Sequence, residues 1–270
     1  MSTPEGASGE GTTHGPAIEV AGLIKRFDTA TVLNEVSFTV EHGTVFGYIG
    51  PNGAGKSTTV KILVGMLQGF LGTVRVEGID VRDDPLGVKR VIGYVPENAA
   101  LYDSLSPFEY LSYVGRLHSL SEDVIEQRGL GLLESLELGP RAHDRISTLS
   151  KGMRQKVLLA SALIHDPRIL ILDEPLSGLD VRSMIIVKEL IRGFADRGRA
   201  IFYCSHVMDV VERVCDRIAI LSGGSIVAQG TFEELATRAA ESSLEQIFRK
   251  LTGGGDEQQK ASGILAALDP

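Results

Sequence analysis

The chain has 270 residues, and its 35 acidic against 27 basic residues give a formal net charge of −8. This charge argues against nucleic acid or an anionic membrane surface as the main binding partner, because both usually require a basic surface. The longest run without Asp, Glu, Lys or Arg, Ile218–Phe232, is interrupted by Ser and Gly and is shorter than the about 20 apolar residues of a spanning helix, so we expect no transmembrane segment.

The N-terminal residues 1–16 are rich in Gly, Ser, Thr and Pro, and they contain neither the basic nor the apolar region of a secretion signal. We expect them to form the disordered tail of a soluble, cytoplasmic protein. Strand patterns begin at Ala17. Val36, Phe38 and Val40 alternate with polar residues, which predicts a half-exposed antiparallel strand.

The following segments alternate between apolar strands and helical patterns. "TVFGYIG" (44–50), "RILILDEP" (168–175) and "AIFYCSH" (200–206) are largely apolar, as expected for strands that are buried on both faces of a sheet. Strands that alternate with helices indicate an α/β fold with a mainly parallel sheet. Residues 98–150 carry amphipathic helical patterns, and they predict a helical subdomain inserted into an α/β domain that spans residues 17–230.

Residues 231–252 predict two C-terminal helices. Thr231 and Glu234 have the spacing of a capping box at the first helix. The second helix carries an apolar stripe at helical spacing, formed by Leu244, Ile247, Phe248 and Leu251. We expect this stripe to pack on the chain's own domain rather than on a partner, and we expect residues 253–270 to be mobile.

The two cysteines, Cys204 and Cys215, belong to no metal-binding pattern. We expect two buried, reduced thiols and no structural metal.

The segment "GPNGAGKST" (50–58) follows a predicted buried strand and precedes a helical pattern. It fits the phosphate-binding pattern G-x-x-x-x-G-K-[ST] in the context that this pattern requires. Glycines let the backbone approach a phosphate closely, and the N–H groups at the helix start favour an anion. The expected nucleotide-binding residues are Gly50, Pro51, Asn52, Gly53, Ala54, Gly55, Lys56, Ser57 and Thr58. Lys56 would reach the β- and γ-phosphates of a bound nucleotide, and Ser57 would hold Mg²⁺.

The buried strand "ILILDEP" (169–175) ends in two acidic residues. Asp173 stands where a carboxylate can bind Mg²⁺ through water, and Glu174 is suited to act as the general base that polarises the attacking water. Acidic residues at strand ends are often only solvated turn residues. Behind a phosphate-binding loop, however, they indicate nucleotide hydrolysis.

These motifs, in this order and spacing, resemble those of ATP-binding cassette (ABC) ATPases, and the resemblance covers residues 17–252. "LSKGM" (149–153) is similar to the signature sequence of that family, Leu-Ser-Gly-Gly-Gln. "SGLD" (177–180) resembles the D-loop, "CSH" (204–206) the switch histidine segment and "GYVPEN" (93–98) the Q-loop. The resemblance also implies a fold with a parallel sheet core, an antiparallel β subdomain and an inserted helical subdomain.

The resemblance assigns further residues to the ATP site. It implies that the ring of Phe27 stacks on adenine, that His206 contacts the γ-phosphate, and that Glu97 at the Q-loop position approaches Mg²⁺. In the family, two cassettes pack head to tail, and each nucleotide lies between the phosphate-binding loop of one chain and the signature helix of the other. Ser150 and Gly152 would therefore serve the ATP of a second copy, and Asp180 would link the two catalytic centres.

Three departures from the family pattern are present: Lys151 and Met153 in the signature, and Glu97 where the family usually carries Gln. With the C-terminal segment they are similar to the ATPase subunits of two-component ABC exporters. The resemblance therefore implies a separate membrane-spanning partner, docked on residues 98–120, that holds this chain at the cytoplasmic face of the membrane. The alternative is a soluble, non-transport ABC ATPase that acts as a regulatory or assembly switch. The transported substrate is not indicated by the sequence.

Overall fold

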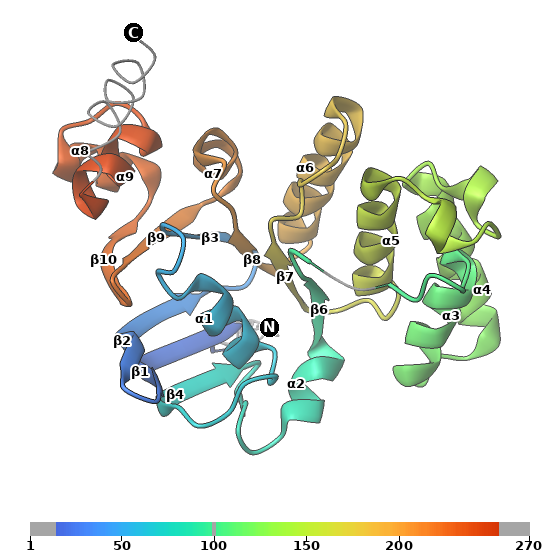
Figure 1. The fold of residues 1–270 in the computed structure, drawn as a ribbon, viewed down its shortest axis with the longest axis horizontal. Coiled ribbons are helices and arrows are strands. Elements are labelled where there is room, and N and C mark those ends of the chain that lie inside the picture. The colour runs from blue at the N-terminus through green and yellow to red at the C-terminus, as the bar shows by residue number, and fades with distance from the viewer. Residues whose placement is uncertain (1–14, 99–100, 254–270) are drawn as a thin grey trace, which may run out of the picture.

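The computed structural model describes residues 15–98 and 101–253. Of the predicted tails, 1–16 and 253–270, all but Gly15, Pro16 and Gly253 lie outside the described residues. The fold is the predicted α/β architecture, with an antiparallel sheet, a mainly parallel sheet and a helical segment inserted between two strands of the parallel sheet (Figure 1).

The antiparallel sheet has the strand order β2-β1-β4-β5. Its strands are β1 (Ile18–Phe27), β2 (Ala30–Val40), β4 (Leu71–Val76) and β5 (Ile79–Asp80). The alternation predicted for the second strand is confirmed, because Val36, Phe38 and Val40 are buried and the residues between them are exposed. This sheet therefore buries only one of its faces.

The second sheet has the order β10-β9-β3-β8-β7-β6, and all of its neighbouring strands are parallel except β9 and β10. Its strands are β3 (Val45–Ile49), β6 (Ile92–Val95), β7 (Ile169–Asp173), β8 (Ala200–Cys204), β9 (Arg217–Ser222) and β10 (Ser225–Gly230). Every residue of β3, β7 and β8 is buried, as their apolar sequences predicted. The carboxyl ends of these three strands carry the motifs singled out in the sequence.

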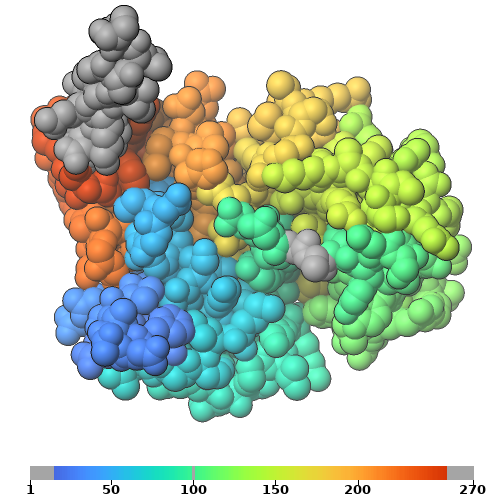
Figure 2. Space-filling model, viewed as in Figure 1, coloured from blue at the N-terminus to red at the C-terminus, as the bar shows by residue number. Residues whose placement is uncertain are grey.

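Helices cover this sheet and extend from it. They are α1 (Lys56–Leu63), α2 (Pro85–Val91), α6 (Val181–Asp196), α7 (Met208–Val214), α8 (Phe232–Ala239) and α9 (Leu244–Thr252). Between β6 and β7 the chain forms α3 (Pro107–Leu117), α4 (Glu122–Ser135), short 3₁₀ turns at Gly139–Arg141 and Ile146–Thr148, and α5 (Lys151–Leu163). The helical segment α3–α5 forms one end of the molecule, and α8 and α9 lie at the opposite corner (Figures 1 and 2).

Apolar side chains join the two sheets on one side of the parallel sheet. The ring of Phe38 on β2 stacks on Phe46 of β3 and on Phe202 of β8, with centroid distances of 5.3 and 5.6 Å. A second cluster of buried side chains links the other side to α5, α6 and the C-terminal helices. Leu244 and Ile247 are fully buried in it, so the apolar stripe of α9 packs on the chain's own core, as predicted.

Candidate nucleotide-binding site

The predicted phosphate-binding loop connects the end of β3 to the start of α1. Gly55 caps the helix with a φ of 111°, a conformation that is open to glycine and strained for other residues. A Cβ atom on Gly50 would lie 2.5 Å from the carbonyl oxygen of Leu221, and a Cβ on Gly55 would lie 2.6 Å from Leu33 Cδ2. The loop can therefore keep its tight path only with glycine at both positions.

Lys56 begins α1, and its side chain folds back over the loop. Its Nζ donates hydrogen bonds to the carbonyl oxygens of Gly50 and Pro51, at 2.5 and 3.1 Å. The ammonium group is thus held at the loop that leads into the start of α1. Positive charge and free donors at the same place suit a phosphate group.

The carboxyl end of β7 brings two acidic side chains to the same edge of the sheet. Asp173 is buried, and this burial, together with the charges of Glu97 and Glu174, raises its pKa to about 6. Lys56 and Lys61 oppose this rise. The negative charge of Asp173 is therefore poorly compensated in the protein alone, and a cation beside it would stabilise the charged carboxylate.

Glu174 follows directly and is fixed by the end of β8. Its backbone has a φ of 50°, in the left-handed region, and its N–H donates to the carbonyl oxygen of Cys204 at 2.9 Å. Its carboxylate accepts hydrogen bonds from the Ser205 hydroxyl at 3.0 Å and from the backbone N–H of His206 at 2.8 Å. The Nδ1 atom of His206 lies 2.7 Å from the same carboxylate oxygen as the N–H group.

One cavity of about 270 Å³ brings these groups together. Its lining contains Asn52, Gly53, Gly55, Lys56, Ser57, Thr58, Glu97, Asp173, Glu174 and His206. Val32, which the sequence did not single out, is also in the lining. The structure thus unites residues from four separate motifs, whereas Gly50, Pro51 and Ala54 belong to the loop without lining the cavity.

The residues of this cavity suit a nucleoside triphosphate with Mg²⁺. Lys56 and the loop supply the donors for phosphate oxygens, and Ser57, Glu97 and Asp173 supply hard oxygen ligands. Within residues 15–98 and 101–253, no group of three or more His, Cys, Asp or Glu side chains could hold a metal by itself. Mg²⁺ is usually bound by one or two carboxylates, water and the phosphates of the substrate.

Ser150, Gly152 and Asp180 form a separate group outside the lining of this cavity. Ser150 caps α5 by accepting a hydrogen bond from the N–H of Met153 at 3.2 Å. Asp180 caps α6 by accepting hydrogen bonds from the N–H and the hydroxyl of Ser183, and these bonds lower its pKa to about 2.

The signature segment and the D-loop segment are in direct contact. A Cβ on Gly152 would lie 2.7 Å from the carbonyl oxygen of Gly178, and the stem of Lys151 lies against the Cα side of Gly178. The start of α5 and the turn before α6 are therefore packed together as one surface.

Phe27 lies at the end of β1 with 43% of its surface exposed, so it is not an ordinary core residue. The Nζ atom of Lys25 lies 4.7 Å from its ring centroid, and the same ammonium donates to the carbonyl oxygens of Gln68 and Gly69. The ring is thus supported by a fixed cation while it stays accessible. Phe27 is not part of the cavity lining.

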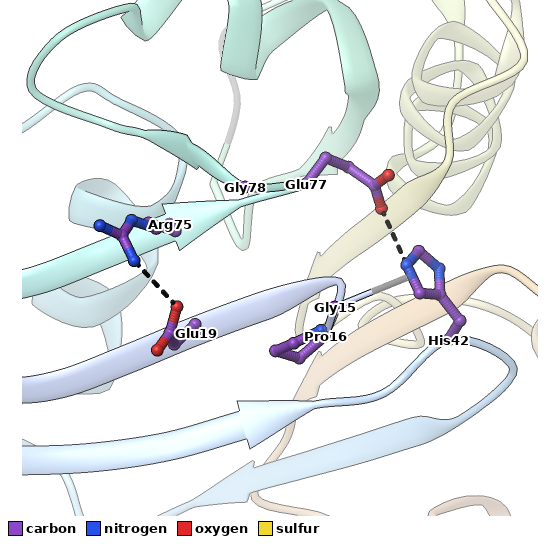
Figure 3. Close-up of a pocket in the computed structure, with 7 residues that line it drawn as sticks. All are labelled: Gly15, Pro16, Glu19, His42, Arg75, Glu77 and Gly78. Atoms are coloured by element: carbon purple, nitrogen blue, oxygen red, sulfur yellow. Dashed lines mark ion pairs between the residues drawn. The ribbon is translucent and has the colours of Figure 1, made fainter. Parts of the chain in front are cut away.

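Another cavity, of about 380 Å³, lies beside the start of β1 and holds none of the predicted site residues (Figure 3). Two pairs of side chains lie close together there. Arg75 lies 3.5 Å from Glu19, and His42 lies 3.6 Å from Glu77. Because Arg75 is already paired with Glu19 and a second carboxylate lines the cavity, it offers less to an anion than the phosphate-binding loop does.

Comparisons with known proteins show which family the chain is similar to. The profile of a protein family described as "ABC transporter" matches residues 33–177. The linearmycin resistance ATP-binding protein LnrL of Bacillus subtilis is 34% identical over 230 residues, which cover 85% of this chain and 74% of that protein. The Nod factor export ATP-binding protein I of Rhizobium meliloti is 39% identical over 243 residues, which cover 90% and 71%.

Solved structures are similar as well. A structure described as the ATP-binding subunit of an ABC transporter has 32% sequence identity and a TM-score of 0.83, and the match covers 87% of this chain and 99% of that one. A dimeric structure of a post-hydrolysis state of the ATP-binding cassette MJ0796, bound to ADP and Pi, has 23% identity and a TM-score of 0.74, with 79% and 98% covered. This second likeness shows a shared fold.

Proposed function

Because the chain belongs to the ABC transporter family, as one of its ATP-binding ATPase subunits, we propose that it drives the export of a substrate through a separate membrane-spanning subunit. The observation that best supports ATP hydrolysis as the energy source is the cavity in which Lys56, Asp173 and Glu174 meet. Relatives named for Nod factor export and linearmycin resistance favour export over import. In the described residues, no helix is both long and apolar enough to span a membrane.

We assign the chemistry of ATP hydrolysis to the residues of that cavity. The loop and Lys56 bind the β- and γ-phosphates, and Glu174 accepts a proton from the water that attacks the γ-phosphate. Ser57 and Asp173, with Glu97, would hold Mg²⁺, which supplies charge neutralisation to the phosphates when it is bound. His206 is positioned to hydrogen-bond the γ-phosphate, because its side chain is 73% exposed at the cavity.

The separate surface formed by Ser150, Gly152 and Asp180 is the basis for a dimer of two copies. On this proposal the start of α5 in one copy covers the nucleotide bound by the loop of the other, so each chain carries half of each of two ATP sites. Val181 and Ile185 are strongly exposed on α6 directly after Asp180, and Val207 is exposed directly after His206. Exposed apolar side chains next to both half-sites favour burial against a second chain.

The docking site for the membrane-spanning subunit is a groove between the parallel sheet and the inserted helices. This groove has a volume of about 270 Å³ and is lined by Val64, Met66, Lys89, Ile92, Tyr94, Tyr110, Val114, His118, Ser161, Ala162 and His165. The imidazole rings of His118 and His165 stack with their centroids 3.7 Å apart. Burial lowers the pKa of both, that of His165 to about 4, so both rings are neutral near pH 7.

Chemistry and position both suit an amphipathic helix of the membrane-spanning subunit as the occupant of this groove. Met66, which lines the groove, exposes 63% of its surface, and Leu117, the residue before His118 in the chain, exposes 67%. Lys89 offers one positive charge. Tyr94 lines the groove and Glu97 lines the nucleotide cavity, only three residues apart in the chain. A helix in the groove would therefore sense changes at the ATP site through β6 and the residues that follow it.

Two variants test the ATP site. Glu174→Gln should retain ATP binding but lose turnover, because the amide cannot accept the proton from water. Ser150→Arg and Lys56→Ala should each be inactive alone, and a mixture of the two should regain turnover, because one intact composite site forms. If Glu174→Gln turns over at the normal rate, the assigned base is wrong; if the mixture stays inactive, the shared site is wrong.

Membrane docking is tested by co-purification from gently solubilised membranes of the source cells. A tagged wild-type chain should recover a membrane-spanning protein, and Leu117→Glu should not, although it should bind ATP normally. Val227→Glu, at an exposed position on β10, is the matched control and should recover the partner. Recovery of no membrane protein by the wild-type chain would favour the soluble, non-transport alternative.

A further inference from the structure

We propose that Ser205 is a positioning residue for ATP hydrolysis, because its hydroxyl group holds the carboxylate of Glu174 in place while His206 turns to the nucleotide. This inference rests on the proposed role of Glu174 as general base. Ser205 was not among the site residues predicted from the sequence.

The hydrogen bonds of Ser205 fix the direction of its hydroxyl group. Its Oγ atom accepts a hydrogen bond from the N–H of Val207 at 3.1 Å. The same hydroxyl donates to Glu174 Oε2 at 3.0 Å. Because a backbone N–H can only donate and a carboxylate can only accept, the hydroxyl hydrogen points to Glu174. Ser205 is 2% exposed, so water does not compete for this hydrogen bond.

The two carboxylate oxygens of Glu174 have different partners. Oε2 is bound by the hydroxyl of Ser205, whereas Oε1 is bound by the backbone N–H and lies 2.7 Å from Nδ1 of His206. The side chain of His206 is 73% exposed, so it can leave Oε1 for a phosphate without breaking a packed contact. Ser205 cannot follow, because it is buried at the end of β8.

This asymmetry assigns a different task to each oxygen. After His206 has turned away, Oε1 is the oxygen that takes the proton from the attacking water, as oxygen bonds to the γ-phosphorus and the bond from that phosphorus to the ADP oxygen breaks. Oε2 stays on Ser205 and prevents the carboxylate from rotating. The backbone of Glu174 is already tied to β8 through its N–H, so the side-chain torsions are the freedom that Ser205 removes.

Full-length variants test the role of Ser205 by separating turnover from binding. Ser205→Ala should lower kcat about tenfold, because a hydrogen bond to a charged group is lost, while the affinity for ATP stays unchanged. Ser205→Thr keeps the hydroxyl group and should retain most of the wild-type kcat. Ser112→Ala is the matched control: Ser112 is also buried, in α3, its hydroxyl donates to the carbonyl oxygen of Phe108, and its loss should leave kcat unchanged.

The outcomes separate this inference from the proposed function. A wild-type kcat in Ser205→Ala overturns it, as does a fall in kcat that is matched by an equal fall in ATP affinity, since this would indicate a structural role only. If Glu174→Gln abolishes turnover while Ser205→Ala does not lower it, the assigned base stands and only the role of Ser205 fails. If Glu174→Gln is fully active, the proposed base fails, whatever the Ser205 variants do.

Discussion

Replacing Gly152 by alanine tests whether the signature segment and the D-loop segment form one packed surface. The new Cβ would lie 2.7 Å from the carbonyl oxygen of Gly178, closer than a carbon and an oxygen can approach without a shift. Gly178 has a φ of 76° and is covered by the stem of Lys151, so the turn has little freedom to move. The substitution should therefore push the turn before α6 away from α5.

The magnitude follows from two opposing contributions. Overpacking of this kind costs about 1–3 kcal/mol. Alanine in place of glycine in the first turn of α5 stabilises the helix by at most about 1 kcal/mol, which offsets part of that cost. For a chain of this size, each net kcal/mol of destabilisation lowers the unfolding temperature by about 2–4 °C.

The assay is thermal unfolding together with ATP turnover, with Gly131→Ala as the matched control. Gly131 lies within α4, and a Cβ there would meet nothing within 4 Å, so this variant has only the favourable helix contribution. Gly152→Ala should unfold at a lower temperature than the wild type, and it should lose turnover while keeping ATP affinity in the monomer. If Gly152→Ala unfolds at or above the temperature of Gly131→Ala, the packed surface does not constrain this position.

Three further variants probe the ATP site. Burial and the neighbouring carboxylates raise the pKa of Asp173 to about 6, so the folded protein without nucleotide favours the protonated form, and its stability should fall as the pH rises from about 4 to about 6. Asp173→Asn should therefore increase the free energy of unfolding by at most about 3 kcal/mol at neutral pH and abolish turnover. Urea denaturation without Mg²⁺ measures this free energy, and an unchanged value would contradict the prediction. Glu97→Gln removes one carboxylate charge from the cavity and should raise severalfold the Mg²⁺ concentration for half-maximal turnover, which an unchanged Mg²⁺ titration would contradict. Phe27→Ala should weaken ATP binding by about 1–3 kcal/mol through lost stacking, with Phe27→Tyr unaffected, and equal affinities in nucleotide titrations would remove Phe27 from the site.

Much of the nucleotide cavity could be predicted from the sequence because its chemistry is carried by local patterns. The phosphate-binding loop needs only a short segment, and the strand before it is recognisable because every residue is apolar or glycine. The starts of helices could be predicted for the same reason, because a cap depends only on neighbours within three residues. Examples are the capping box at Thr231 and Glu234 and the cap of α5 at Ser150. The short helix α2 carries similar signals, Asp84 as cap and Pro85 at its first position, but its few residues gave no periodic pattern.

Contacts between distant segments could not be predicted in this way. Glu174 and Ser205 meet because β7 and β8 are parallel neighbours with Asp173 opposite Cys204, and nothing in either strand's sequence specifies that register. The support of Phe27 by Lys25 depends equally on tertiary structure, because the carbonyl groups that hold the ammonium come from Gln68 and Gly69. In both cases the contact joins segments that are distant in the sequence, so it depends on the tertiary structure.

The strand β6 gives a physical reason why one chain could connect ATP to a membrane-spanning partner. Tyr94 on this strand lines the proposed docking groove, and its pKa is raised to about 12, first by burial and then by the charge of Asp173 and, more weakly, of Glu97. The electrostatic field of the nucleotide cavity therefore reaches a side chain in the groove. Binding of a nucleotide with its cation, and later loss of the γ-phosphate, would each change the charge beside Asp173 and therefore that field. Any partner helix seated against Tyr94 would thus have different contact energies in the two nucleotide states, which is the condition for a ligand to shift a conformational equilibrium.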